Sequence, residues 1–337
     1  MKPLATLIIG LFLPILSFAT QDSISIKSIF GTLQAQAIIN VTIETNLDSL
    51  INYRKRETYQ PANFTYKAAN GQVITHKIKV KPRGKYRRSV CDFPTIKLNF
   101  SKKELKANGM TKYDDYKVVT HCLDDKKESK ENVSREYLVY KLYNLLSPKS
   151  YQVKYLHITY VDSKGKVSSL KRTGFLIEDT GELEARIGVE VYAKARLPID
   201  SFDMEQYNFV ALFQYMIGNV DWRATPFTKN TKAIKVNGVG KYQLIPYDFD
   251  FSGVVNVSYM RIAEHLQQKD TRQRIFLGHI TSQKELKSNF ERFEAKKNEL
   301  LKYISNFDLL PKTSRKSIWN YIESFYEDIA DGMVRMM

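Results

Sequence analysis

The stretch KAIKVNGVGKYQLIPYDFDFSG, residues 232–253, contains a predicted β-hairpin that ends in two acids. Two strand-forming runs flank Asn237-Gly238, a dipeptide typical of two-residue hairpin turns. The second run leads directly into Asp248 and Asp250. Because an unpaired charge beside a core is costly, these carboxylates are expected to have a partner, and a divalent cation is one.

The segments on either side of this hairpin predict grouped strands followed by helices. Alternating apolar residues predict strands within 64–80, 94–100, 113–122, 151–162 and 172–179. Helical spacing predicts a helix within 131–148, a buried helix at 204–217, and mostly helices after about residue 258. Strands that are grouped, without regular alternation with helices, predict an α+β fold with two closely packed lobes.

The first twenty residues, MKPLATLIIGLFLPILSFAT, have the layout of a secretory signal peptide. One lysine precedes an apolar run, and small residues follow it around Ser17 and Ala19. An uncleaved membrane anchor is the alternative, but the run is short for a span. The sequence therefore predicts export to a periplasmic or extracellular location, cleavage after residue 19, and no transmembrane span in the mature protein.

The chain carries 52 Lys and Arg against 36 Asp and Glu, a formal net charge of +16. A basic surface attracts polyanions, for example an anionic polymer of the cell envelope. A plain solvated basic surface is the simpler interpretation. No finger, helix-turn-helix or RNA-binding signature accompanies the charge, so a specific nucleic-acid partner is not predicted.

Cys91 and Cys122 are the only cysteines. Export permits a disulfide between them, and the alternative is two buried thiols. Two cysteines cannot form a structural zinc site alone, and the histidines lack metal-ligand spacing; they are His76, His121, His157, His265 and His279.

Four polar residues in the second half of the chain suggest phosphoryl transfer. Asp221 follows the predicted buried helix, Asn230 comes soon after, and Asp248 and Asp250 follow the hairpin. Phosphoryl transfer uses one carboxylate to orient the attacking hydroxyl, and an Asn with another carboxylate to hold Mg²⁺. The same residues could instead cap a helix, form a turn and end a strand.

Several short motifs, in this order, resemble the CotH family of atypical kinases, in a form found in exported bacterial proteins. They are RGKYRRSVCDFPTIKLNF (83–100), YKVVTHC (116–122), SREYLVYKLYNLLS (134–147), FLIED (175–179), GNVDWR with KN (218–230) and LIPYDFDFSGVV (244–255). The resemblance implies a two-lobed protein-kinase-like fold with a β-rich N-terminal lobe, residues 20–180, and a mostly helical C-terminal lobe, residues 181–337. It also implies transfer of the ATP γ-phosphoryl group to a protein Ser or Thr hydroxyl with Mg²⁺ or Mn²⁺.

The resemblance assigns five residues to nucleotide binding. Lys97 corresponds to the strand lysine that contacts ATP phosphates, and Glu136 to its helix partner. Arg83 and Lys85 are expected to assist at the phosphates. Glu178 falls where the inter-lobe hinge would contact adenine. By the same resemblance, Asp221 is the catalytic-loop acid, Asn230 a metal ligand, and Asp248 or Asp250 the metal-binding Asp, with Asp248 preferred.

Each of these assignments has a simpler alternative. Lys97 could be a solvated strand residue, Glu136 could pair with Arg135 or Lys141 on its own helix, and Glu178 could be an exposed acid. The whole protein could be a non-catalytic relative, an exported binding protein with a basic ligand surface. A transferase acting on a glycan hydroxyl would use the same chemistry.

Overall fold

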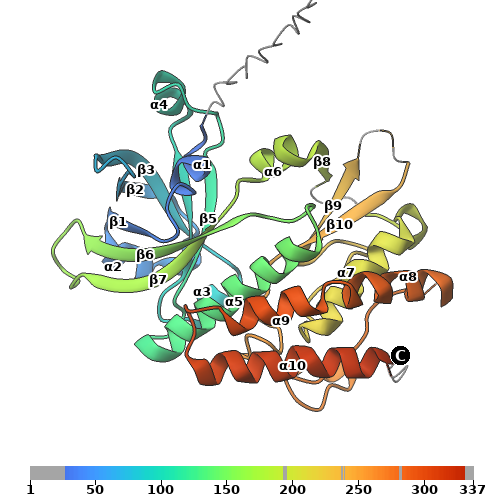
Figure 1. Ribbon diagram of the computed structural model, residues 1–337. Helices are drawn as coiled ribbons and strands as arrows, with labels where there is room; N and C mark the ends of the chain where they lie inside the picture. Colours follow the sequence, from blue (N-terminus) through green and yellow to red (C-terminus); the bar gives the residue numbers. More distant parts are fainter. Residues whose placement is uncertain (1–26, 193–195, 237, 239, 281–282, 331–337) are drawn as a thin grey trace, which may run out of the picture.

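A computed structural model describes residues 27–192, 196–236, 238, 240–280 and 283–330 (Figure 1). The predicted signal peptide lies outside these residues. None of the helices in the described ranges combines the length and apolar character needed to cross a bilayer.

Seven strands of the first half form a closed barrel (Figure 1). In spatial order they are β1 (Ile39–Thr45), β2 (Gln60–Lys67), β3 (Val73–Arg83), β4 (Thr95–Phe100), β5 (Asp115–Thr120), β7 (Leu170–Ile177) and β6 (Val153–Asp162). Neighbouring strands are antiparallel except β1 and β6, which pair in parallel with Ile39 opposite Leu156. This parallel pair closes the sheet on itself.

Apolar residues at alternate positions fill the barrel, because successive strand residues face opposite sides of a sheet. On β1 the pattern is strict, with Ile39, Val41 and Ile43 buried between more exposed neighbours. Short helices α1 (Ile29–Leu33), α2 (Leu47–Asn52) and α4 (Lys102–Ala107) lie around it, with the 3₁₀ turn η1 (Arg54–Arg56). The helix α3 (Arg87–Val90) follows β3 directly.

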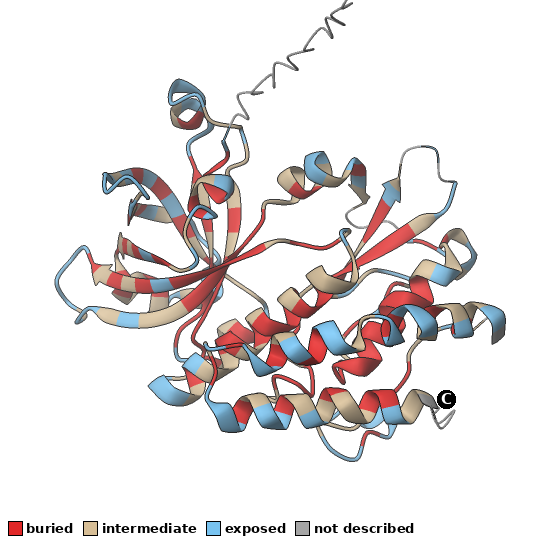
Figure 2. Cartoon of the chain, viewed as in Figure 1, coloured by how far each residue is buried: buried red, intermediate tan, exposed pale blue. Residues whose placement is uncertain are grey.

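The second half builds a separate layer from helices and a small sheet (Figures 1 and 2). The sheet has the order β10 (Tyr242–Pro246), β9 (Thr231–Val236), β8 (Val189–Tyr192), all antiparallel. Around it lie α6 (Thr180–Ile187), α7 (Met204–Met216), α8 (Gln283–Glu294), α9 (Lys297–Ser305) and α10 (Lys312–Ala330), with the 3₁₀ turns η2 (Ile199–Ser201) and η3 (Glu264–Leu266). The long helix α5 (Lys126–Leu146) packs between this layer and the barrel.

The predicted two-lobed, kinase-like fold is wrong. The strands of the first half close into a mixed barrel, and the second half contains a three-stranded sheet beside its helices. Alternation along a sequence marks strands and their apolar face, but it does not specify which strands become neighbours. The expected boundary between residues 180 and 181 falls at the start of α6 and stays a prediction.

Several local predictions are confirmed. β9 and β10 form the predicted hairpin, although Asn237 in its turn lies outside the described residues. The apolar run after Met204 forms the buried helix α7. Cys91 and Cys122 form a disulfide, which joins the end of α3 to the chain after β5. The N–H of Asp92 reinforces this junction by donating to the carbonyl oxygen of Cys122 at 2.8 Å.

Candidate functional site

Backbone pairing beyond α7 places the two acid-bearing loops side by side. Gly218 turns the chain with φ of +66°, a conformation that favours glycine. Its carbonyl oxygen accepts the N–H of Gly253 at 3.0 Å, and Asn219 forms a β-bridge with Ser252. The loop that follows α7 is therefore held against the loop that follows β10.

Asn230 fixes Asp221 from a tight turn in the first of these loops. Arg223 and Lys229 exchange backbone hydrogen bonds of 3.1 and 2.8 Å, which returns the chain toward Asp221. The Asn230 amide then donates to the Asp221 carboxylate at 2.9 Å and to its main-chain oxygen at 2.7 Å. The Lys229 ammonium forms an ion pair with the same carboxylate. Asp221 is thus held by two neighbours.

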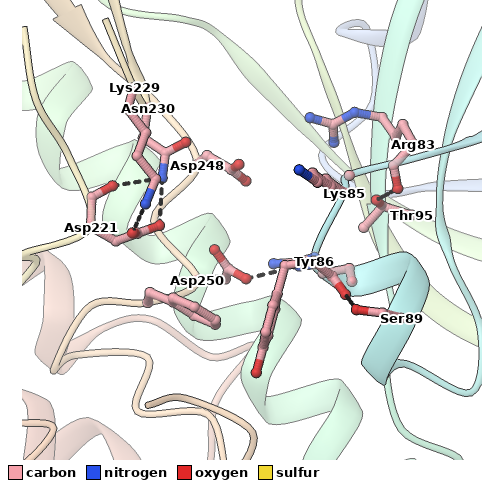
Figure 3. A pocket seen from close by; sticks show the side chains of 13 residues that line it. Arg83, Lys85, Tyr86, Ser89, Thr95, Asp221, Lys229, Asn230, Asp248 and Asp250 are labelled. Carbon is pink, nitrogen blue, oxygen red and sulfur yellow. Dashed lines mark hydrogen bonds and ion pairs between the residues drawn. The ribbon is translucent and has the colours of Figure 1, made fainter. Parts of the chain in front are cut away.

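A cavity of about 600 Å³, called the first pocket below, lies between these loops and the end of β3. Its acidic wall consists of Asp221, Asn230, Asp248 and Asp250, with Lys229 beside them. Its other wall comes from the barrel and consists of Arg83, Gly84, Lys85, Tyr86, Arg87, Ser89 and Thr95. Figure 3 shows the Asp248 carboxylate directed toward the side of the pocket that carries Arg83 and Lys85.

Arg87 joins the two walls beneath the first pocket. Its Nε donates to Asp250 and its NH2 group to Glu136, both at 2.9 Å, and all three side chains are buried. Burial disfavours charge on Arg87, but the two carboxylates outweigh it and raise the pKa of the guanidinium. Burial also raises the pKa of Asp250, and it raises the pKa of Glu136 to about 7. The Arg87 guanidinium therefore pairs with two carboxylates, those of Asp250 and Glu136.

Lys117 lies on β5 close to both walls. Its ammonium is 4.7 Å from the Tyr247 ring centroid and 5.9 Å from that of Tyr151. Burial first, and then the positive charges of Arg83 and Lys232, lower the pKa of Lys117 to about 7, although Asp248 acts in the opposite direction. An added anion near Arg83 would raise this pKa again.

The structure brings together six of the nine residues nominated from the sequence. Asp221, Asn230, Asp248, Asp250, Arg83 and Lys85 all line the first pocket. Glu136 lies below it, bound to Arg87.

The expected Lys97–Glu136 ion pair is not formed. Lys97 instead pairs with Asp115 on the adjacent strand, because both side chains project from the same face of the sheet. Glu136 is buried against Arg87. Lys97 does not line the first pocket.

Glu178 is also engaged elsewhere and does not line the first pocket. Both of its oxygens accept from the Arg186 guanidinium, at 2.7 and 2.9 Å, and one accepts the N–H of Gln152 at 3.0 Å. The side chain is buried, so the exposed-acid alternative is wrong as well. The structure gives Glu178 a clear part in joining α6 to the barrel.

The first pocket offers few oxygen donors to a hard divalent cation. Described Asp, Glu, His and Cys residues form no group of three or more placed to share a metal ion. Asp248 and the Asn230 side-chain oxygen remain as donors, because the Asn230 nitrogen faces Asp221 and one Asp250 oxygen faces Arg87. Mg²⁺ accepts one or two carboxylates when phosphate oxygens and waters complete its shell.

Sequence reasoning missed Arg87, Lys229 and Lys117. Lys229 directly precedes Asn230, so the prediction of Asn230 as a site residue could have pointed to Lys229 as well. Arg87 lies inside the quoted 83–100 motif, but nothing in the sequence marks it as buried. Lys117 lies opposite Lys97 on the same face of the sheet. Only the pairing of β4 with β5 shows this, so the sequence alone could not.

No protein-family model matches this chain, and no curated protein matches it. The resemblance to the CotH family therefore stays a prediction that rests on the sequence motifs.

Proposed function

We propose that the first pocket binds a nucleoside triphosphate such as ATP together with Mg²⁺ or Mn²⁺, and transfers a phosphoryl group to a hydroxyl of a protein Ser or Thr. One observation carries the proposal: a wall of oxygen donors faces a wall of cationic side chains across a single cavity. Phosphoryl transfer needs this pairing, because the metal and the cations neutralise charge on the same phosphate oxygens. The proposal does not depend on a kinase-like arrangement of lobes.

The barrel wall would bind the phosphate chain. Arg83 at the end of β3 presents a planar guanidinium suited to two phosphate oxygens, and Lys85 adds a point charge. The backbone between them passes through Gly84 with φ of +80°, and the Thr95 hydroxyl donates to the Arg83 carbonyl oxygen at 3.0 Å. Arg83 and Lys85 therefore project from a turn that this hydrogen bond stabilises.

The acidic wall would hold the divalent cation and orient the acceptor. Asp248 and the Asn230 oxygen supply metal ligands, with the second oxygen of Asp250 nearby. A bound divalent cation would supply charge neutralisation at the phosphates. The Asp221 carboxylate has lone pairs beyond those used by Asn230 and Lys229, so it can still accept the proton of a hydroxyl.

The proposed transfer is a displacement at the γ-phosphorus of the nucleotide. The acceptor oxygen forms a bond to the γ-phosphorus, and the bond from that phosphorus to the β–γ bridging oxygen breaks. The nucleoside diphosphate leaves with that electron pair, and Asp221 takes the acceptor's proton.

A non-catalytic binding role is the second candidate, and the Lys229–Asp221 ion pair favours it. The Lys229 ammonium contacts an oxygen of the carboxylate that would have to accept the proton of a substrate hydroxyl. In this alternative the pocket holds a polyphosphate or another anionic ligand without transfer. An anionic polymer of the cell envelope would suit the same basic wall.

Incubation with γ-labelled ATP, Mg²⁺ or Mn²⁺ and a mixed Ser/Thr protein acceptor distinguishes the candidates. The proposal predicts metal-dependent label transfer that falls about a hundredfold or more in Asp248→Asn, since metal neutralisation contributes several kcal/mol. Asp308→Asn, an exposed acid far along the chain, is the matched control and should transfer like the wild type. Binding without transfer in the wild type would favour the second candidate.

A further inference from the structure

A second pocket of about 560 Å³ is lined by residues from the start of α5 and from β6 and β7. Its lining comes from β1, β6, β7, α5 and the residue that follows β5. It shares no lining residue with the first pocket. The function proposed above makes no use of it.

The charged side chains that line the second pocket are all cationic. Four cationic side chains line it, Lys126, Lys130, Lys171 and Arg172, and no lining residue is Asp or Glu. The nearest ion-pair partner is Asp124, whose carboxylate is 3.9 Å from the Arg172 guanidinium and is 79% exposed. A pair of that length with so exposed an acid offsets little of the positive charge.

His121 lines this pocket with a buried ring whose Nε2 has no hydrogen-bond partner among the described residues. The Nδ1 of the same ring is hydrogen-bonded to Thr120 Oγ1 at 3.1 Å, and the Tyr160 hydroxyl donates to that Oγ1 at 3.0 Å. Burial lowers the pKa of His121 far below its ordinary value, so the ring is neutral. Nε2 of the neutral ring is therefore a buried polar atom that the described residues leave without a partner.

Arg172 supplies a buried donor without a partner in the described part of the chain. Its side chain is only 8% exposed, and its Nε has no hydrogen-bond partner among the described residues. One terminal nitrogen donates to the Lys171 carbonyl oxygen at 3.2 Å. A buried donor without a partner destabilises the fold, and more so when it is charged. Two residues of this lining, His121 and Arg172, thus each carry a buried polar atom without a partner among the described residues, and the lining holds four cations and no acid.

We propose that the second pocket binds a phosphate group carried on a larger molecule. A tetrahedral dianion offers four oxygens and two charges to the Arg172 guanidinium and the three lysines of this lining, whereas a carboxylate offers two oxygens and one charge. The volume exceeds that of one phosphate, so the rest of the ligand would occupy the space beside Asn40 and Thr159. The inference does not rest on the function proposed for the first pocket.

Calorimetric titration of inorganic phosphate into the full chain tests this site. Arg83→Gln/Lys85→Gln serves as the background, because it weakens phosphate binding in the first pocket. In that background the proposal predicts binding that Arg172→Gln weakens about tenfold or more, since a charge-assisted hydrogen bond contributes 1.5–3 kcal/mol. Because Arg172 is buried, the exposed pair Lys126→Gln/Lys130→Gln is tested in parallel and should weaken binding about threefold to tenfold.

Lys127→Gln/Lys103→Gln is the matched control, since both lysines are exposed and neither lines the second pocket. It should bind phosphate like the background. At equal ionic strength, sulfate should compete with phosphate, and acetate should bind about tenfold more weakly. Glycerol phosphate should bind at least as tightly as inorganic phosphate. Equal affinity in the background, the pocket variants and the control would overturn the proposal, as would acetate binding as tightly as phosphate or no phosphate binding at all.

Discussion

Arg87 donates from Nε to the Asp250 carboxylate at 2.9 Å, and this contact ties the barrel to the loop that follows β10. The two residues lie far apart in the sequence, and both are buried. Because Arg87 also binds Glu136, one guanidinium positions an acid of the first pocket against the long helix α5.

Arg87→Met should destabilise the fold by about 3–5 kcal/mol, because it leaves two buried carboxylates without their cation. The triple variant Arg87→Met/Glu136→Gln/Asp250→Asn removes the stranded charges and should lose clearly less. Urea unfolding followed by circular dichroism measures both. A triple variant as unstable as Arg87→Met would show that charge pairing is not the cause.

Nucleotide affinity should fall as the pH rises above about 7, because free Lys117 loses its proton there. A bound polyphosphate raises the pKa of Lys117, so binding above pH 7 must take up a proton. The dissociation constant should therefore increase by up to about tenfold per pH unit between pH 7 and 9. Below pH 7 Lys117 is charged in both states and contributes no slope.

Fluorescent ATP-analogue titrations from pH 6 to 9 would measure this dependence. Lys117→Met should flatten the profile, and Lys316→Met, an exposed lysine of α10, should leave it unchanged. A wild-type profile that matches Lys117→Met would remove Lys117 from the account of nucleotide binding.

Gly218→Ala should destabilise the protein more than Gly188→Ala. Both glycines have positive φ, +66° and +64°, so both substitutions cost about 1–2 kcal/mol in backbone strain. At Gly188 a new Cβ would meet nothing within 4 Å, whereas at Gly218 it would overlap the Tyr321 hydroxyl. Thermal unfolding compares the two, and equal losses would contradict the close packing of this turn.

The disulfide should contribute about 3–4 kcal/mol through the chain entropy of the loop it closes, whose ends are 31 residues apart. Cys91→Ala/Cys122→Ala should lose this amount in guanidinium unfolding. A reductant should destabilise the wild type similarly and leave the double variant unchanged. Little change in either case would indicate that the surrounding hydrogen bonds alone hold α3 to the chain after β5.

Local elements could be predicted from the sequence because their signals are local. The β9–β10 hairpin follows from its alternation and turn residues, and α7 from its continuous apolar run. The helix predicted within 131–148 begins earlier in the structure, at Lys126. There the Asp125 side chain accepts the N–H of Glu128 at 2.7 Å and caps the first turn.

Features that depend on distant pairing could not be predicted. The barrel closes because β1 pairs with β6. Nothing in the sequence of either strand indicates that the other is its partner. The partner of Lys97 depends on the register of β4 with β5, which places Asp115 within reach. The partner of Glu178 is nearer in the sequence, since Arg186 lies eight residues later on α6, but the sequence does not show that this arginine points back toward Glu178. By contrast, Asp221 and Asp248 were predicted to share one site because their side-chain chemistry suggested a common role, and both line the first pocket.

Titration of a non-hydrolysable ATP analogue, with Mg²⁺ and then with EDTA, tests the central claim most directly. If a divalent cation joins the acidic wall to the phosphates, the wild type should bind at least about tenfold more tightly with Mg²⁺, and Asp248→Asn should lose that difference. Affinity that is the same with and without Mg²⁺, and unchanged in Asp248→Asn, would contradict it.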